Sequence, residues 1–153
     1  MSPRTLYRRI AIAEVVSWAL LLLGMVLKYV TGTTDLGVKV FGMVHGVVFI
    51  AFCLITVLVA VNQRWSVREA GLGLLSAVPP FLTVWFERRM ERRARLDGGW
   101  RLGHPEAQPA NPAERLLHLL LARPAVAVAV GLVAVAALTG VALLVGPPVG
   151  QQG

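Results

Sequence analysis

The sequence contains a single cysteine among 153 residues, and Cys53 lies inside an apolar run. One cysteine cannot form an intrachain disulfide, so the fold does not depend on a disulfide framework. We expect Cys53 to act as a small apolar packing residue. The cellular compartment therefore has to be inferred from other features of the chain.

Acidic residues and histidines are also scarce, with 8 Asp and Glu against 15 Lys and Arg, and only 3 His. His104 and His118 are too isolated for a metal site, and no nucleophile stands beside a base. We therefore expect no enzyme, no metal and no cofactor. The net charge of +7 comes without a nucleic-acid-binding motif. It predicts a bilayer with anionic headgroups as the partner, and no nucleic acid.

Apolar residues dominate the chain at 56%, and they gather in four blocks. These blocks cover residues 10–30, 38–61, 70–86 and 125–145. Each is close to the roughly 17 to 25 residues that cross the hydrocarbon of a bilayer, where the backbone has to be helical to satisfy its own polar groups. The predicted fold class is all-α. It is a polytopic integral membrane helical bundle with three N-terminal hydrophobic helices plus one C-terminal transmembrane helix.

Composition divides the chain into three parts. Residues 8–95 form the three-helix membrane domain. Residues 96–124 form a basic linker rich in Gly and Pro, with a short interfacial helix. Residues 125–153 form the C-terminal transmembrane helix and tail.

Two helix starts are marked by capping residues. Ser66 and Glu69 have the spacing of a capping box, which predicts a helix that begins after Ser66. Asn111 is placed as an N-cap, followed by Pro112 at the first helical position and Glu114 at the third. We expect this second helix to lie in the membrane interface.

The third apolar block contains Pro79 and Pro80 near its middle, and these remove two backbone donors and bend or interrupt the helix. We favour a kinked full span, because non-helical backbone at membrane depth needs cover that a small bundle hardly provides. The alternative is a re-entrant segment that returns at the two prolines. With the N-terminus inside, that alternative leaves only Lys28 and Lys39 outside, which fits the positive-inside tendency best. Orientation stays open.

Three polar residues form a candidate intramembrane polar site: Glu14, Ser17 and His45. Glu14 reads as a proton or cation site, or as a near-interface carboxyl paired with a neighbouring helix or with Arg8 or Arg9. Measured from the centres of their segments, the Cα levels of Glu14 and His45 differ by about 16 Å. We therefore expect no direct contact between them.

Small residues spaced by four predict helix-packing faces. Gly42 and Gly46 make a GxxxG pair beside His45. In the last block, two further pairs face opposite sides of the helix; they are Ala127 with Gly131 and Ala136 with Gly140. Each face is expected to pack against another helix.

The stretches "AEVVSW", "FGMVHGVVF" and "SAVPPFLTVWFERR" resemble, in this order, a family of small bacterial integral membrane proteins known as domain of unknown function 3817. The resemblance covers residues 8–95. It implies a multi-pass protein of the bacterial plasma membrane with a three-helix unit, and it implies no activity.

Together these features favour a small membrane protein that is not an enzyme. We expect it to be a packing or accessory component. It would associate through the helix face that carries Gly42 and Gly46, the glycine face, either with a second copy, as a homo-oligomer, or with a larger membrane complex. The alternative is a small transporter or proton-coupled carrier that uses Glu14 and His45.

Overall fold

The computed structural model describes residues 1–145, and every regular element in that range is helical. The elements are α1 (Pro3–Met25), a π-helical turn η1 (Val26–Val30), α2 (Leu36–Asn62), α3 (Val67–Leu75), α4 (Leu82–Arg92), a short 3₁₀ turn η2 (Arg101–Gly103), α5 (Pro112–Ala122) and α6 (Pro124–Val145). The chain is thus the all-α, polytopic helical protein that the sequence predicts. The last part of the predicted C-terminal tail, residues 146–153, lies outside the described residues.

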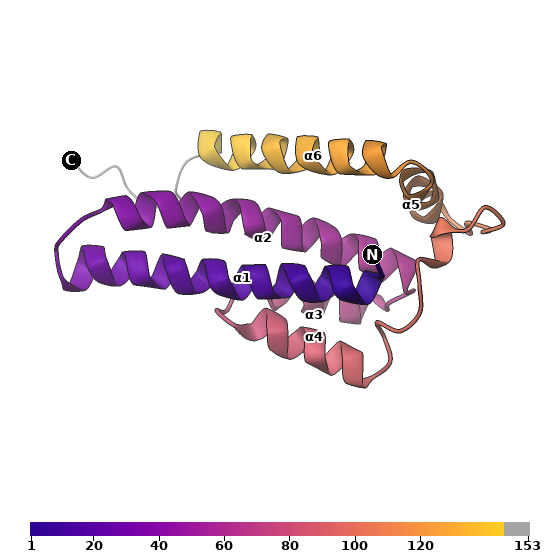
Figure 1. Ribbon diagram of the computed structural model, residues 1–153, viewed down its shortest axis with the longest axis horizontal. Helices are drawn as coiled ribbons and strands as arrows, with labels where there is room; N and C mark the ends of the chain where they lie inside the picture. The colour runs from indigo at the N-terminus through magenta and orange to yellow at the C-terminus, as the bar shows by residue number, and fades with distance from the viewer. Residues whose placement is uncertain (146–153) are drawn as a thin grey trace.

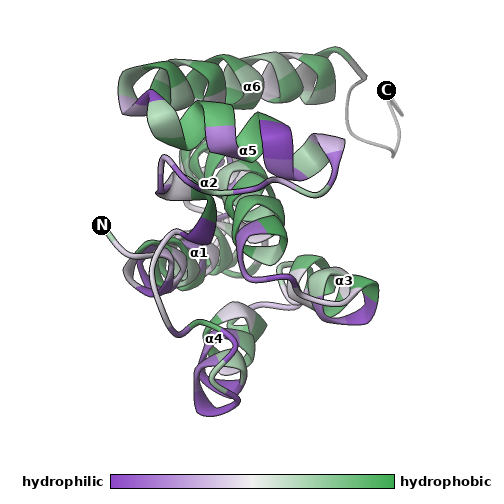
Figure 2. Ribbon diagram, turned by 90° about the vertical axis from the view of Figure 1, so that its right-hand side faces the viewer, coloured by the Kyte–Doolittle hydropathy of each residue, from purple (hydrophilic) through white to green (hydrophobic). Residues whose placement is uncertain are grey.

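The long antiparallel hairpin of α1 and α2 is the centre of the molecule (Figure 1). The helix α4 packs against α1, and α3 packs against α2. On the other side of α2 lie α5 and α6 (Figure 2). Among the described residues, three helical stretches are long and apolar enough to cross a membrane: Pro3–Val30, Leu36–Asn62 and Pro124–Ala142.

The third apolar block is two short helices, and the favoured kinked full span was wrong. Both outer ends of the α3 and α4 pair meet, since the Trp65 indole N–H donates to the Arg95 carbonyl at 2.9 Å. At the inner end, the indole of Trp18 in mid-α1 donates to the Ala77 carbonyl at 3.3 Å. The block therefore enters and returns on one side of the hairpin, as the re-entrant alternative has it.

The lengths of these helices agree with a half-depth hairpin. At 1.5 Å per residue, the 9 residues of α3 and the 11 of α4 are about 14 and 17 Å long, near half of a hydrocarbon core of about 30 Å. Pro79 and Pro80 lie in the turn between them, where Phe81 has a left-handed φ of 68°. The prolines thus interrupt the helix, and the needed cover comes from α1 and α2.

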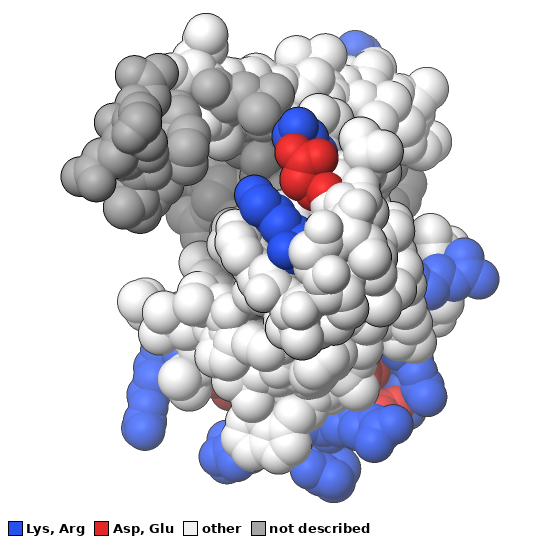
Figure 3. Space-filling model, turned by 90° about the vertical axis from the view of Figure 1, so that its left-hand side faces the viewer, with Lys and Arg blue, Asp and Glu red and all other residues white. Residues whose placement is uncertain are grey.

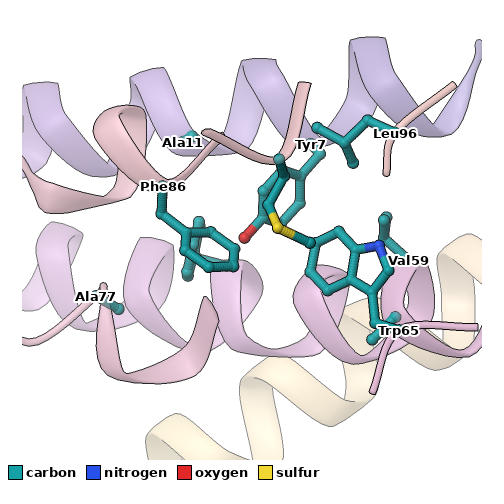
Figure 4. Close-up of a cluster of buried hydrophobic side chains, with 10 residues drawn as sticks. Tyr7, Ala11, Val59, Trp65, Ala77, Phe86 and Leu96 are labelled. Atoms are coloured by element: carbon teal, nitrogen blue, oxygen red, sulfur yellow. The ribbon is translucent and has the colours of Figure 1, made fainter. Parts of the chain in front are cut away.

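A compact core closes the outer end of this hairpin (Figure 4). Tyr7 of α1 is fully buried. Its ring centroid lies 5.6 Å from the ring centroids of both Phe52 and Trp65. Trp65 in turn packs edge-on against Phe86, with the two ring centroids 6.0 Å apart. Aromatic side chains bury large apolar areas and add geometric preference. This cluster fastens the re-entrant hairpin to α1 and α2.

Both predicted helix starts are confirmed. Ser66 caps α3 with its side chain accepting from the Glu69 N–H, while the Glu69 carboxylate accepts from the Ser66 N–H at 2.8 Å. Asn111 caps α5, accepting from the Glu114 N–H at 2.9 Å, and Pro112 is the first helical residue. The linker before α5 also folds onto the bundle, since His118 Nδ1 lies 2.7 Å from the Leu102 carbonyl oxygen.

Candidate functional site

Four polar or aromatic side chains meet about halfway along the α1 and α2 hairpin, and we name them the membrane polar cluster: Glu14, Ser17 and Trp18 from α1 and His45 from α2. The Ser17 hydroxyl oxygen lies 2.9 Å from His45 Nδ1. His45 Nδ1 also lies 3.8 Å from the Glu14 carboxylate. The three predicted site residues are therefore neighbours.

The prediction that Glu14 and His45 lie too far apart for contact was wrong. It counted the level of each residue from the centre of its apolar segment, and the segment centres do not set the register of the two helices. Gly24 sets the register instead, since a Cβ there would lie 2.6 Å from the Gly37 carbonyl carbon. Ser17 stands seven residues before Gly24, and His45 stands eight residues after Gly37. At 1.5 Å per residue both are about 10 to 12 Å from that crossing. They share one level of the membrane.

Glu14 is fully buried, and neither of its carboxyl oxygens has a hydrogen-bond partner. Isolated carboxylates are costly at membrane depth, and such residues are rare outside functional or paired positions. The ionisable side chain that approaches this carboxyl is that of His45, which is 12% exposed. Glu14 is thus not the near-interface carboxyl paired with Arg8 or Arg9 that one reading of the sequence allows.

One proton arrangement satisfies both contacts of Ser17. Its hydroxyl donates to the Glu14 backbone carbonyl at 2.9 Å and accepts from Nδ1–H of His45. In this tautomer Nε2 of the imidazole is an acceptor. In this arrangement the cluster holds a buried carboxyl beside a neutral imidazole.

The tip of the re-entrant hairpin covers this cluster from one side. The ring of Trp18 packs on the His45 ring with centroids 4.4 Å apart, while its N–H reaches the Ala77 carbonyl. Phe49 stands further along α2, 6.3 Å from the imidazole. The hairpin therefore fixes the indole, and the indole fixes the imidazole.

The predicted packing residues are divided between partly covered and open positions. A Cβ at Gly42 would meet only Leu21, at 3.8 Å, and one at Gly46, Gly131 or Gly140 would meet nothing within 4 Å. Ala127 is partly buried, and Ala136 is exposed. These faces are not used for close helix contact by the described part of the chain, and their role between molecules stays a prediction.

Ion pairs fasten the N-terminal end of the bundle. Glu69 accepts from Arg95 at 2.7 Å, and this hydrogen bond, together with the Ser66 N–H, lowers the pKa of Glu69 to about 2. Arg4 of α1 pairs with Glu91 of α4. These pairs join elements far apart in sequence. Sequence reasoning missed them because it assigned the arginines to lipid headgroups.

A second ion-pair group holds the linker. Arg101 donates to Glu114 at 2.7 Å, and the Ala110 N–H donates to the same carboxylate at 2.8 Å. Both hydrogen bonds lower the pKa of Glu114, and the one from Arg101 has the larger effect. Arg64 lies further from it, at 3.6 Å.

Charge differs sharply between the two ends of the bundle. The arginines lie in the N-terminal part of α1, between α2 and α3, in α3 and α4, or between the end of α4 and the start of α6. Both lysines flank the loop between α1 and α2. Figure 3 is viewed onto the loop end, where Lys39 pairs with Asp35 at 2.6 Å. Among the described residues, no group of three or more His, Cys, Asp and Glu could hold a metal ion.

The long apolar helices define the class of this chain, that of multi-pass helical membrane proteins. Residues 4–92 match the family described as domain of unknown function DUF3817, and the chain belongs to that family. The match ends where α4 ends. The linker, α5 and α6 therefore stand outside it.

Two relatives extend this finding. The chain is 50% identical over 88 residues to a Streptomyces coelicolor protein named as a membrane protein, SCO5905, covering 57% of this chain and 10% of that protein. It is 32% identical over 69 residues to the uncharacterised membrane protein YdzA of Bacillus subtilis, covering 45% of this chain and 71% of that protein. The chain thus spans a tenth of the first relative's length. No solved structure matches it.

Proposed function

We propose that this protein is a non-enzymatic accessory component of a membrane assembly, which docks a further transmembrane helix on the glycine face of α2. The observation that carries the proposal is Gly46, where an added Cβ would meet nothing within 4 Å. Gly42 is also open apart from Leu21. Small residues spaced by four let helix backbones approach closely, so this face suits a second helix.

The contrast with Gly24 supports the assignment. Gly24 and Gly37 are already in backbone contact within the hairpin, whereas Gly42 meets only the Leu21 side chain and Gly46 meets nothing within 4 Å. Met43 and Val47, which flank that pair, are 61% and 38% exposed. A partner helix would cover them.

The share of each relative that the match covers also supports an accessory role. The segment similar to SCO5905 makes up a tenth of that membrane protein, so a unit of this kind is there part of a much longer chain. In YdzA it makes up most of the protein. We infer that the partner is a second copy of this chain or a larger membrane complex.

The arginine-rich end sets the orientation that we propose. Positive residues near spans favour the cytoplasmic side, which places the N-terminus, the outer end of the re-entrant hairpin and the linker inside. We propose the bacterial plasma membrane as the site, in contact with anionic headgroups. The relatives in Streptomyces coelicolor and Bacillus subtilis are both bacterial.

The test is association in native membranes, measured by energy transfer between labelled copies and by co-purification of partner proteins. Gly42→Leu and Gly46→Leu are expected to reduce association, because the longer side chain holds the partner backbone away. Gly71→Leu is the matched control, since Gly71 of α3 also has open space around it. Association that is unchanged by the α2 variants would remove the glycine face from the account.

The second candidate function is a proton-coupled carrier, and the buried, unpartnered carboxyl of Glu14 beside His45 favours it. It predicts that Glu14→Gln or His45→Ala abolishes proton flux in proteoliposomes without reducing the amount of protein in the membrane. Flux equal to that of the wild type would return these residues to a packing role.

A further inference from the structure

Two neighbouring cavities lie along one face of α2, and we call them the outer and inner parts of one groove. In Figure 2, α3 lies on one side of α2, and α5 and α6 lie on the other. The outer part has a volume of about 570 Å³ and lies near the end of α2, lined by Ala60, Ala70 and Ala113 among others. The inner part, of about 580 Å³, lies deeper and is lined by Ile50, Leu75 and Leu138 among others. Val57 lines both parts, so they lie next to each other along α2.

Polarity changes along this groove. The polar side chains of its lining, Arg64, Asn111 and Glu114, all belong to the outer part, at the level where the end of α2 meets the linker. Among the described residues, those that line the inner part carry no charged side chain. A ligand that fits both parts has a polar head at the membrane interface and an apolar chain that points toward the membrane centre.

The charge at the mouth selects the head. Glu114 is already bonded by Arg101 and the Ala110 N–H. The side chain of Arg64 lies 3.6 Å from that carboxylate and is 65% exposed. Its remaining guanidinium donors are open to a second anion, and a guanidinium matches phosphate geometry well.

The length of the groove suits a chain from one leaflet. From Ile50 to the end of α2 at Asn62 is twelve residues, or about 18 Å at 1.5 Å per residue, and Arg64 follows two residues later. Half of a hydrocarbon core of about 30 Å is about 15 Å. One acyl chain therefore fits between the headgroup level and the inner end of the groove.

We propose that this groove is a binding site for a membrane phospholipid with an anionic headgroup, whose phosphate bonds to Arg64 and one of whose acyl chains lies along α2 between α3 and α6. The site is separate from the glycine face and does not depend on the function proposed for that face. Binding here would cover the space between α6 and the family domain, and so hold the added span in place.

The test is native mass spectrometry of the full chain in detergent, with phosphatidylglycerol and phosphatidylcholine of identical acyl chains at equal concentration. The wild type is expected to retain phosphatidylglycerol preferentially. Arg64→Gln is expected to weaken its retention about tenfold, the equivalent of about 1.4 kcal/mol. Val57→Trp, which fills the groove from a side chain that is 47% exposed, is expected to reduce retention as well.

Arg92→Gln is the control. It also removes one positive charge, but from an exposed position at the end of α4, away from the groove. It is expected to retain the lipid as the wild type does, and circular dichroism checks that all variants keep their helix content. Equal retention of both lipids by the wild type would overturn the proposal. So would an equal loss from Arg64→Gln and Arg92→Gln, because that result indicates diffuse attraction to the basic surface.

Discussion

Gly24 of α1 lies directly against the backbone of Gly37 in α2. A Cβ at position 24 would be 2.6 Å from the Gly37 carbonyl carbon. No side chain fits in that space. The contact fixes how far α1 slides along α2, and it thereby brings Ser17 level with His45.

Gly24→Ala is predicted to destabilise the protein by about 1 to 3 kcal/mol, the usual cost of overpacking, because the two backbones would have to separate. Gly71→Ala is the matched control, with nothing within 4 Å of its added Cβ. That change is expected to stabilise α3 by about 0.5 to 1 kcal/mol. Thermal unfolding in detergent measures both, and a Gly24→Ala midpoint equal to that of the wild type would show that the helices do not meet there.

Much of the fold could be predicted from local signals. Ser66 and Asn111 marked the starts of α3 and α5, since a cap acts on the next three residues of the same chain. The long apolar runs located α1, α2 and α6. Such features depend on neighbours in sequence, which the sequence lists in order.

The relations between helices could not be predicted in the same way. Gly24 and Gly37 form no motif within one helix, so nothing marked them as a contact, and the register taken from segment centres placed Glu14 too far from His45. The return of the third block also depends on a distant pair, Trp65 with Arg95. Its two prolines showed where the helix breaks but not which way the chain then runs.

The half-depth hairpin predicts which segments share a side of the membrane. In a Cys53→Ser background, a cysteine at Val67 and one at Gln108 are expected to react with a membrane-impermeant thiol reagent from the same side. A cysteine at Thr33, in the loop between α1 and α2, is expected to react from the other side. All three positions are exposed. Labelling of Val67 and Gln108 from opposite sides would mean that the third block crosses the membrane.

The bond between Arg95 and Glu69 predicts a pH-dependent stability. Because the pKa of Glu69 is lowered from 4.5 to about 2 in the folded protein, its contribution is complete above about pH 4.5 and is lost as pH falls toward about 2. Arg95→Gln is expected to cost about 1 kcal/mol at pH 7, a modest value because the pair is partly exposed. The difference in melting temperature from the wild type should shrink over that acid range, whereas a constant difference would assign the effect to packing. Arg92→Gln controls for the loss of one charge.

Ser17→Ala is predicted to destabilise the membrane polar cluster by about 1 to 3 kcal/mol, because Nδ1 of His45 loses its partner in a buried position. Ser17 is 3% exposed. Thr31→Ala is the control, since it also removes a hydroxyl that bonds to a helix carbonyl but at an exposed site. The nitrogen shifts of His45 should change in the first variant alone. An unchanged imidazole spectrum in Ser17→Ala would contradict the hydrogen bond.

The docking of a helix on the glycine face of α2 is the central claim, and site-specific photocrosslinking in native membranes tests it most directly. A photoreactive residue at Met43, beside Gly42 and Gly46, is compared with one at Leu72 on α3, which is 47% exposed. We predict that Met43 forms a crosslink to a second copy or to another membrane protein, and that Gly46→Leu reduces its yield by about tenfold, equivalent to about 1.4 kcal/mol. Lipid adducts alone from Met43, or equal protein crosslinks from Met43 and Leu72, would contradict the claim.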